Sequence, residues 1–190
     1  MNYQESKKRL TALHQRIADT RTEMRAVLGA IEPEEVEDYR FSTRQGEVRL
    51  SQLFGRHKDL FVIHNMGSSC PYCTLWADGY NGVYAHLAQR AGFVVSSPDT
   101  PEVQERFAQG RGWKFPMVSH RGTSFAQDMG YRGEKGGWLP GVSVFQRGGE
   151  RIVRVADSGF NPGDDFCAVW HFLDLLPDGA AGWQPKFSYE

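Results

Sequence analysis

Residues 60–73 decide the fold, and they read LFVIHNMGSSCPYC. The apolar residues 60–63 predict a buried strand over residues 59–65. Pro71 follows directly after Cys70, and proline is well tolerated as the first residue of a helix. The two cysteines of this stretch, Cys70 and Cys73, are therefore expected where a strand gives way to the first turn of a helix.

This position gives the cysteine pair a definite chemistry. The first turn of a helix has unpaired N–H groups and the positive end of the helix dipole, and both stabilise a thiolate. A thiol with a lowered pKa acts as a nucleophile near neutral pH. Cys73 lies one turn further on and can attack the resulting mixed disulfide. The sequence thus predicts Cys70 as the nucleophile and Cys73 as the resolving cysteine of a dithiol.

Zinc binding and an inert pair are the alternatives to redox chemistry. Structural zinc takes four ligands, and only Cys167 and six scattered histidines could complete a site, without a second cysteine pair. The strand-before, helix-after context favours redox chemistry, so no metal ligand is predicted. The sequence contains no flavin or nicotinamide fingerprint, so no bound cofactor is expected. Cys167 is expected to be a buried packing residue.

The rest of the chain alternates between strands and helices. The helices are expected at residues 4–31, from 71 through 87 with a bend or a weak spot near Gly79 and Gly82, and at 101–109, 124–129 and 164–176. The strands are expected at 39–43, 47–50, 93–97, 114–119, 142–145 and 151–156, the last two joined by a turn at 147–150. Such alternation predicts an α/β fold, a central mixed sheet flanked by helices. Residues 1–38 are expected to form an N-terminal helix and hinge, 39–177 the main domain and 178–190 a tail.

The helix predicted over residues 4–31 carries one apolar row. Its members follow one another three or four residues apart once Thr20 takes one position: Leu10, Leu13, Ile17, Met24, Val27 and Ile31. Such a row either packs on the protein's own domain or joins two chains into a homodimer. The sequence leaves both interpretations open.

Composition argues against several classes of partner. The formal net charge is −1, which gives no reason to expect nucleic acid or an anionic membrane. Residues 60–63 form too short an apolar run to span a membrane. The first residues form no apolar segment, so no secretion signal is expected and the expected location is cytoplasmic. Structural disulfides rarely persist in the cytosol, where paired cysteines are more often catalytic or metal-binding.

Several segments resemble the thioredoxin superfamily. Residues 61–73 resemble its active-site segment, and CPYC is the form typical of glutaredoxins. Residues 139–145, LPGVSVF, followed by RGGE at 147–150, are similar to the loop, strand and turn that carry the superfamily's cis-proline. With NMGSSC at 65–70 and WADG at 76–79, the chain resembles a bacterial thioredoxin-like family catalogued as a domain of unknown function. The resemblance implies a thioredoxin-like fold with an N-terminal helical extension.

The resemblance also implies site residues. A cis Leu139–Pro140 bond would present a backbone edge to an extended substrate near Cys70; Pro116 is a weaker candidate for the cis-proline. His64 stands where thioredoxins carry a buried acid, so it is either a proton acceptor for Cys73 or a core histidine. Substrate contacts are expected from five residues, although the two aromatic ones suit a core equally well: Pro71, Tyr72, Trp138, Leu139 and Pro140.

The chain resembles the peroxiredoxins in layout but lacks their cysteine motif. Residues 98–130 form a segment that a minimal thioredoxin does not have, and this segment is placed as in peroxiredoxins. Peroxiredoxins, however, place proline seven residues and threonine or serine three residues before the peroxidatic cysteine, where this chain has Ile63 and Gly67. A variant peroxide site that uses Thr74 and Arg147 stays an alternative.

The predicted function is therefore reduction or exchange of protein or small-molecule disulfides, with electrons from an unidentified donor. A glutathione-linked or peroxide-reducing enzyme is the alternative within the same chemistry. A redox-sensing or zinc-binding interaction module is the alternative outside enzymes.

Overall fold

The computed structural model describes residues 2–149 and 151–189, and these fall into two compact units that divide between Pro33 and Glu34. The first unit contains helix α1 (Tyr3–Gly29). A reciprocal capping box begins it: the Glu5 N–H donates to Asn2 Oδ1 at 2.9 Å, and the Asn2 N–H donates to the Glu5 carboxylate at 3.0 Å. The predicted N-terminal helix is thus confirmed.

The apolar row of the first unit is exposed to solvent. No described residue of α1 is buried, and the six apolar side chains of the row are between 40% and 68% exposed. Burial of such a row against another apolar surface would be favourable. Dimerisation through this helix stays a prediction.

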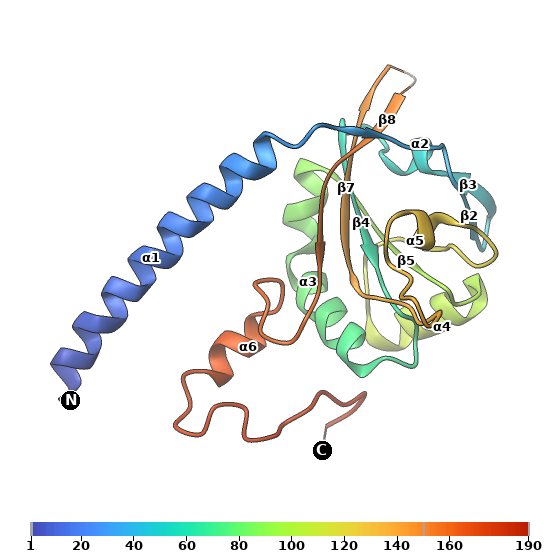
Figure 1. Ribbon diagram of the computed structural model, residues 1–190. Coiled ribbons are helices and arrows are strands. Elements are labelled where there is room, and N and C mark those ends of the chain that lie inside the picture. Colours follow the sequence, from blue (N-terminus) through green and yellow to red (C-terminus); the bar gives the residue numbers. More distant parts are fainter. Residues whose placement is uncertain (1, 150, 190) are drawn as a thin grey trace. The chain divides into compact units, whose positions relative to one another are not determined.

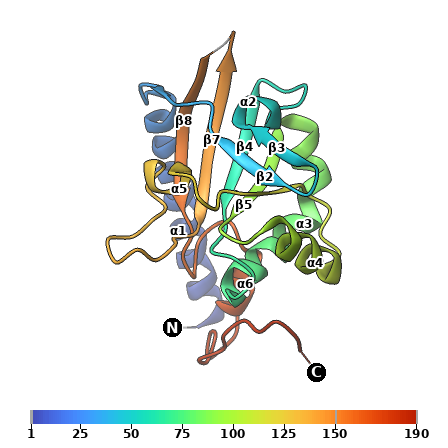
Figure 2. The ribbon, with the colours of Figure 1, turned by 90° about the vertical axis from the view of Figure 1, so that its right-hand side faces the viewer.

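The second unit is built on a mixed sheet. Its described strands follow the order β1-β8-β7-β4-β5-β6-β2-β3, in which β4, β5 and β6 are parallel to one another and the other pairs are antiparallel. Figure 2 shows β7, β4 and β5 side by side. The strands are β1 (Glu34–Glu35), β2 (Arg40–Thr43), β3 (Gly46–Arg49), β4 (Asp59–His64), β5 (Gly92–Ser97), β6 (Met117–Ser119), β7 (Gly141–Gly148) and β8 (Arg151–Gly159).

Helices cover both faces of this sheet, as the sequence predicted. They are α2 (Leu50–Leu53), α3 (Pro71–Arg90), α4 (Pro101–Arg111), α5 (Phe125–Asp128) and α6 (Ala168–Leu173). Figure 1 shows α3 on one side of β4 and β7 and α5 on the other. Alternation along β4 divides the core between them: Leu60 and Val62 pack with Phe125 of α5, whereas Ile63 packs with Trp76 of α3.

Helix α3 continues without a break through Gly79 and Gly82, both of which are exposed, and a bend or weak spot near them stays a prediction. Another helix prediction needs correction. The last helix is shorter than the predicted 164–176. The Asp164 carboxylate accepts the backbone N–H groups of Asn161 and Phe166, and these bonds fix a loop before α6 begins.

The turn predicted at residues 147–150 includes Glu150, which lies outside the described residues. The strands on either side of it, β7 and β8, pair as far as Gly148 and Arg151. No described helix is long and apolar enough to cross a membrane.

The three parallel strands end at one edge of the sheet. β4, β5 and β6 end at His64, Ser97 and Ser119, and the loops that follow them lie outside these carboxyl ends. In open α/β sheets this edge is where ligands bind. The loop after β4 leads directly to Cys70.

Candidate redox site

A short, tightly held loop carries the chain from β4 to the cysteines. Asn65 Oδ1 accepts the Gly67 N–H at 2.8 Å, and Asp99 Oδ2 accepts the Ser68 N–H at 2.7 Å. Gly67 has φ +107°, and a Cβ there would approach the carboxylate oxygens of Asp99 to 3.2 Å. Glycine therefore meets both a backbone and a packing requirement at this position. The loop ends as the Cys70 N–H donates to the Gly67 carbonyl oxygen at 3.2 Å.

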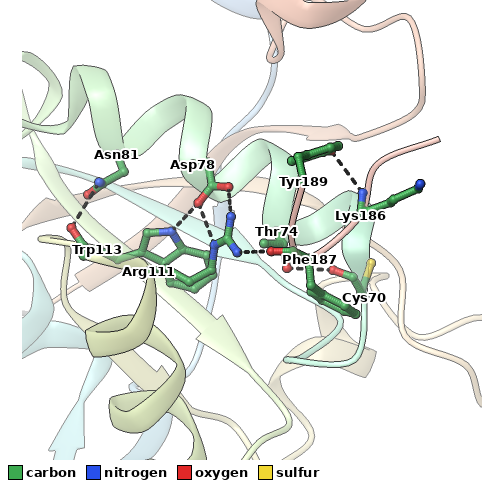
Figure 3. Close-up of polar contacts among 10 residues, drawn as sticks. Cys70, Thr74, Asp78, Asn81, Arg111, Trp113, Lys186, Phe187 and Tyr189 are labelled. Atoms are coloured by element: carbon green, nitrogen blue, oxygen red, sulfur yellow. Dashed lines mark hydrogen bonds and ion pairs between the residues drawn. The ribbon is translucent and has the colours of Figure 1, made fainter. Parts of the chain in front are cut away.

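Cys70 forms the N-cap of α3 through its sulfur. Its Sγ accepts the backbone N–H of Cys73 at 3.1 Å, in the manner of the usual N-cap oxygen. The Cys70 carbonyl oxygen accepts both the Thr74 N–H at 3.1 Å and the Thr74 hydroxyl at 3.0 Å, the second of which Figure 3 shows. The sulfur of Cys70 is thus held against the unpaired N–H groups of the helix start.

This geometry separates the pKa values of the two thiols. The hydrogen bond from the Cys73 thiol, with the backbone N–H groups of Cys73 and Tyr72, lowers the pKa of Cys70 to about 7 against the opposing effect of burial. The same hydrogen bond, together with burial, raises the pKa of Cys73 far above its ordinary value. Near neutral pH the pair therefore carries its negative charge on Cys70.

The two sulfurs also differ in access. Cys70 is half-buried, whereas Cys73 is 2% exposed and accepts the Met66 N–H at 3.4 Å. A reactant arriving from solvent meets Cys70 first. Cys73 faces Cys70 and is shielded from direct attack.

Pro71 and Tyr72 lie where the sequence placed them, in the first turn of α3, and both are partly exposed. The ring of Tyr72 stacks on Trp170 of α6 with a centroid distance of 6.2 Å and lies 6.3 Å from Trp76. Trp76 in turn donates its Nε1–H to Asp164. Trp170 of α6 thus packs against the residue that lies between the two cysteines.

The segment before β7 differs from the prediction. Every described peptide bond is trans, so the expected cis Leu139–Pro140 bond is wrong. The Leu139 N–H donates to the Tyr131 carbonyl oxygen at 2.9 Å, and the Phe160 N–H donates to the Pro140 carbonyl oxygen at 2.9 Å. These bonds hold the segment extended in line with β7, which suits the intrinsically preferred trans form. Because the Pro140 carbonyl is already paired, it offers no free edge to a substrate.

Trp138 lies with a different set of side chains from Tyr72. Its ring meets His120 edge-on at 4.9 Å between centroids, and the Arg132 guanidinium lies 4.6 Å from the ring centroid. Leu139 beside it is 45% exposed. The structure therefore does not bring Trp138 and Tyr72 together as one aromatic surface.

His64 lies on the opposite face of the sheet from α3. Its Nε2 is 2.9 Å from Ser143 Oγ, and its ring stacks on Tyr131 at 3.7 Å between centroids. Burial, with the nearby His120 and Arg154, holds the pKa of His64 well below its ordinary value. The expected contact with Cys73 is not made, because alternation along β4 places His64 with Leu60 and Val62 instead.

A second buried histidine escaped the sequence analysis. His120 is 2% exposed, and its Nδ1 is 2.8 Å from Ser96 Oγ. Burial, with a smaller effect of Arg132, lowers the pKa of His120 to about 4. Asp99 was missed as well, although a polar residue directly after a buried strand at this sheet edge was a usable signal.

Hydrogen bonds and an ion pair connect α3 to α4 and to the C-terminal segment (Figure 3). Asp78 of α3 forms an ion pair with Arg111 and accepts the Trp113 Nε1–H at 2.8 Å. Arg111 also donates to the Phe187 carbonyl oxygen at 2.7 Å. These bonds hold the helix that carries the cysteines against its neighbours.

Cys167 is buried in the same core cluster as Trp76 and Trp170, at the N-cap of α6. Burial raises the pKa of its thiol. Cys70, Cys73 and Cys167 are all free thiols. Within residues 2–149 and 151–189, no group of three or more His, Cys, Asp or Glu side chains is placed to hold a metal ion.

A family model covers nearly the whole chain. The family is described as "Bacterial protein of unknown function (DUF899)", and its model matches residues 2–186. The chain belongs to this family. No curated protein matches this DUF899 member.

Solved structures similar to this DUF899 protein include peroxiredoxins and a peroxiredoxin-like protein. Peroxidoxin BcpB from Mycobacterium tuberculosis is 22% identical, with a TM-score of 0.53 over 72% of this chain and 88% of that chain. Reduced Prx3 from Vibrio vulnificus is 14% identical, with a TM-score of 0.57 over 70% and 89%. A peroxiredoxin-like protein from Aquifex aeolicus is 16% identical, with a TM-score of 0.53 over 67% and 74%. The likeness confirms the thioredoxin-like fold with a peroxiredoxin-like layout.

Proposed function

We propose that this protein is a thiol–disulfide oxidoreductase in which Cys70 attacks a disulfide and Cys73 resolves the intermediate. One observation carries the proposal. The Cys70 sulfur caps α3 by accepting the Cys73 N–H at 3.1 Å, with its pKa lowered to about 7, while the buried Cys73 keeps its proton. Within one helical turn, Cys70 thus has the properties of a nucleophile and Cys73 those of a resolving thiol.

The reaction follows from this arrangement. The Cys70 thiolate attacks one sulfur of the substrate disulfide, forming a mixed disulfide and releasing the first substrate thiolate, which takes a proton from solvent. Cys73 then loses its proton and attacks Cys70 Sγ, which breaks the mixed disulfide and releases the second substrate thiolate. The protein ends with a Cys70–Cys73 disulfide, and the substrate has gained two electrons and two protons. A dithiol donor restores the reduced protein by the reverse exchange.

The charge on Cys70 explains why Cys73 reacts only after Cys70 has attacked the substrate. While Cys70 is a thiolate, it raises the pKa of Cys73 through their hydrogen bond. Once Cys70 is bonded to substrate sulfur, that negative charge is gone, and the Met66 N–H at 3.4 Å favours a thiolate on Cys73. The attack by Cys70 thus prepares Cys73 to act.

Reduction of a peroxide is the second candidate, and the fold of the structural neighbours favours it. One of them is described as reduced Prx3 in complex with H2O2 from Vibrio vulnificus. The side chains of this chain support it less. Thr74 donates its hydroxyl to the Cys70 carbonyl oxygen, and Arg147 donates to the Gly55 carbonyl oxygen while its guanidinium lies over Phe54, near the amino end of β4. Neither side chain donates to Cys70 Sγ.

A single-turnover experiment tests the proposal. The fully reduced protein is mixed with one equivalent of bis(2-hydroxyethyl) disulfide or of hydrogen peroxide, quenched with acid at intervals, and analysed by mass spectrometry. We expect the disulfide to yield a Cys70–Cys73 bond in the wild type and a stable Cys70 mixed disulfide in Cys73→Ser. Cys167→Ser is the matched control and should behave as the wild type. Absence of both products would overturn the proposal, and faster oxidation by peroxide than by the disulfide would favour the second candidate.

A further inference from the structure

A cavity of about 470 Å³ opens at the same sheet edge as Cys70. It is lined by residues of three loops: Asp99 and Thr100 after β5, Arg121 and Thr123 after β6, and Arg132 and Trp138 before β7. Its volume falls within the range of small-molecule sites, about 300–1,000 Å³. The position agrees with the edge at which open α/β sheets bind ligands.

The cavity adjoins the loop that carries Cys70. Asp99, on its wall, accepts the Ser68 N–H at 2.7 Å. Cys70 follows Ser68 by two residues, and an extended chain advances at most about 3.6 Å per residue, so this carboxylate lies within about 10 Å of the Cys70 backbone nitrogen. This wall of the cavity is therefore close to the segment that carries Cys70.

The lining has an excess of positive charge. Arg121 and Arg132 contribute two guanidinium groups against the single carboxylate of Asp99, which is already engaged with Ser68. Among the described residues, neither arginine forms an ion pair with a carboxylate. An anionic group entering the cavity would therefore find two available cations.

One of these cations lies over an aromatic ring. The Arg132 guanidinium lies 4.6 Å from the centroid of Trp138, and that ring makes an edge-type contact with the buried His120. A guanidinium can rest on an aromatic ring and still bind a carboxylate through its N–H groups in a bidentate manner. The aromatic support thus orients Arg132 before a ligand arrives.

We propose that this cavity binds a carboxylate of a small, acidic disulfide substrate and so directs its sulfur to Cys70. The proposal rests on the thiol–disulfide activity proposed above and names its substrate class. Arg132 is assigned the bidentate contact and Arg121 a second charge at the mouth of the cavity. A cationic disulfide of similar size would be disfavoured by the same two arginines.

The first test compares charge. The protein is assayed with oxidised glutathione, which is anionic, the neutral bis(2-hydroxyethyl) disulfide and the cationic cystamine, with a dithiol as reductant. We expect kcat/KM to fall in that order. The ratio of kcat/KM for the anionic substrate to kcat/KM for the neutral one should fall about threefold in each of Arg121→Gln and Arg132→Gln. It should fall about tenfold in the double variant, because partly exposed charge pairs each contribute effects of this size. Raising the ionic strength from 0.1 to 1 M should also reduce it, because the Debye length falls from about 10 to about 3 Å.

Arg56→Gln is the matched control. Arg56 is an exposed arginine before β4, at the other end of that strand from Cys70, and it lies outside this cavity. Its substitution should leave all three rates unchanged. If wild-type protein does not discriminate among the three disulfides, or the Arg121 and Arg132 variants keep the wild-type ratio, the proposed substrate class is wrong.

The second test measures binding without chemistry. S-methylglutathione carries the same carboxylates and cannot exchange, and calorimetry should show binding to the wild type that is weakened in Arg121→Gln and Arg132→Gln but not in Arg56→Gln. Arginine-dependent binding without turnover of any disulfide would refute the proposed function and leave the cavity as an anion site. Turnover of the neutral disulfide without such binding would refute the cavity assignment and leave the function.

Discussion

Two regions at one end of the sheet bury titratable side chains on opposite faces. On the face of α3, Cys70 and Cys73 share a hydrogen bond at a helix start. On the other face, His64 and His120 each pair one ring nitrogen with a serine hydroxyl and leave the other, His64 Nδ1 and His120 Nε2, without a partner. Both regions lie close to the point where the chain leaves β4.

The difference lies in what stabilises the charged form. At the helix start, N–H and S–H donors point at a sulfur and favour its thiolate, so the pKa of Cys70 falls to about 7. In the histidine region, burial acts without an acid to favour the imidazolium, so the pKa values of both histidines fall and the rings stay neutral. Burial alone makes a group inert, whereas burial with matched donors and access makes it reactive.

The largest expected effect comes from removing the reactive sulfur. Cys70→Ser should lower the rate of disulfide reduction by at least about a thousandfold, because a serine hydroxyl does not ionise near neutral pH. The turnover rate of bis(2-hydroxyethyl) disulfide by the variant and the wild type measures this loss. Cys167→Ser should retain full activity, and comparable losses in the two variants would mean that Cys70 has no special role.

A smaller but still large effect is expected in the alkylation rates of the two cysteines. At pH 7 about half of Cys70 is thiolate when its pKa is about 7, whereas Cys73 is almost fully protonated. Iodoacetamide should therefore modify Cys70 more than about fiftyfold faster than Cys73. The Cys70 rate should rise about tenfold between pH 5 and 6 and level off above pH 8. Peptide mapping measures both rates, and faster labelling of Cys73 would reverse the assignment.

The histidine region should be detected through stability instead of reactivity. A histidine whose folded pKa is depressed contributes stability above its unfolded pKa of about 6.5 and loses it as the pH falls towards the folded value. For His120 that value is about 4. Between pH 7.5 and 5.5 the free energy of unfolding should therefore fall by about 1.4 kcal/mol on account of His120, because the unfolded chain takes up the proton and the folded chain does not.

Urea unfolding at the two pH values measures this loss. His120→Gln should reduce the acid-induced loss by about 1.4 kcal/mol, the contribution of one histidine. His86→Gln, at an exposed position of α3, should keep the wild-type loss. An unchanged loss in His120→Gln would show that His120 titrates alike in the folded and unfolded chain.

The cysteine region could be predicted from the sequence because local rules determine it. An apolar strand, a CxxC motif and a proline at the first helical position place Cys70 as an N-cap whatever the rest of the fold does. The mixed sheet and its helices followed from alternation along the chain, and the structure confirms them. The shortened last helix was missed because Asp164 bonds to the backbone around it, which helical periodicity does not show.

The surroundings of the site could not be predicted because long-range packing determines them. His64 was expected near Cys73 from its position in the chain, but strand phase and the register with β7 place it beside Ser143. The Leu139–Pro140 bond was expected to be cis, yet pairing with Tyr131 and Phe160 holds the segment extended. The cavity with Arg121 and Arg132 depends on three loops that meet only in the folded chain.

The smallest expected effect tests whether the two faces act independently. If His64 were the proton acceptor for Cys73, removing it would slow the second step and let the mixed disulfide accumulate. The structure pairs His64 Nε2 with Ser143 and stacks its ring on Tyr131, on the face away from α3. His64→Gln should therefore release the reduced substrate within about twofold of the wild-type rate. If His64 were the proton acceptor, its loss should slow this step by about 10²–10⁴-fold, because positioned proton transfer contributes a factor of that size. Acid quench and mass spectrometry after one turnover give that rate.

His120→Gln is the matched control for this experiment, because it removes a second buried histidine from the same face. Equal, near-wild-type release from both variants would show that the sheet insulates the cysteines from the histidines. Accumulation of mixed disulfide in His64→Gln alone would show that His64 reaches Cys73 during the reaction. Cys73 would then take its proton acceptor from across the sheet, and the contrast between the two faces would no longer hold.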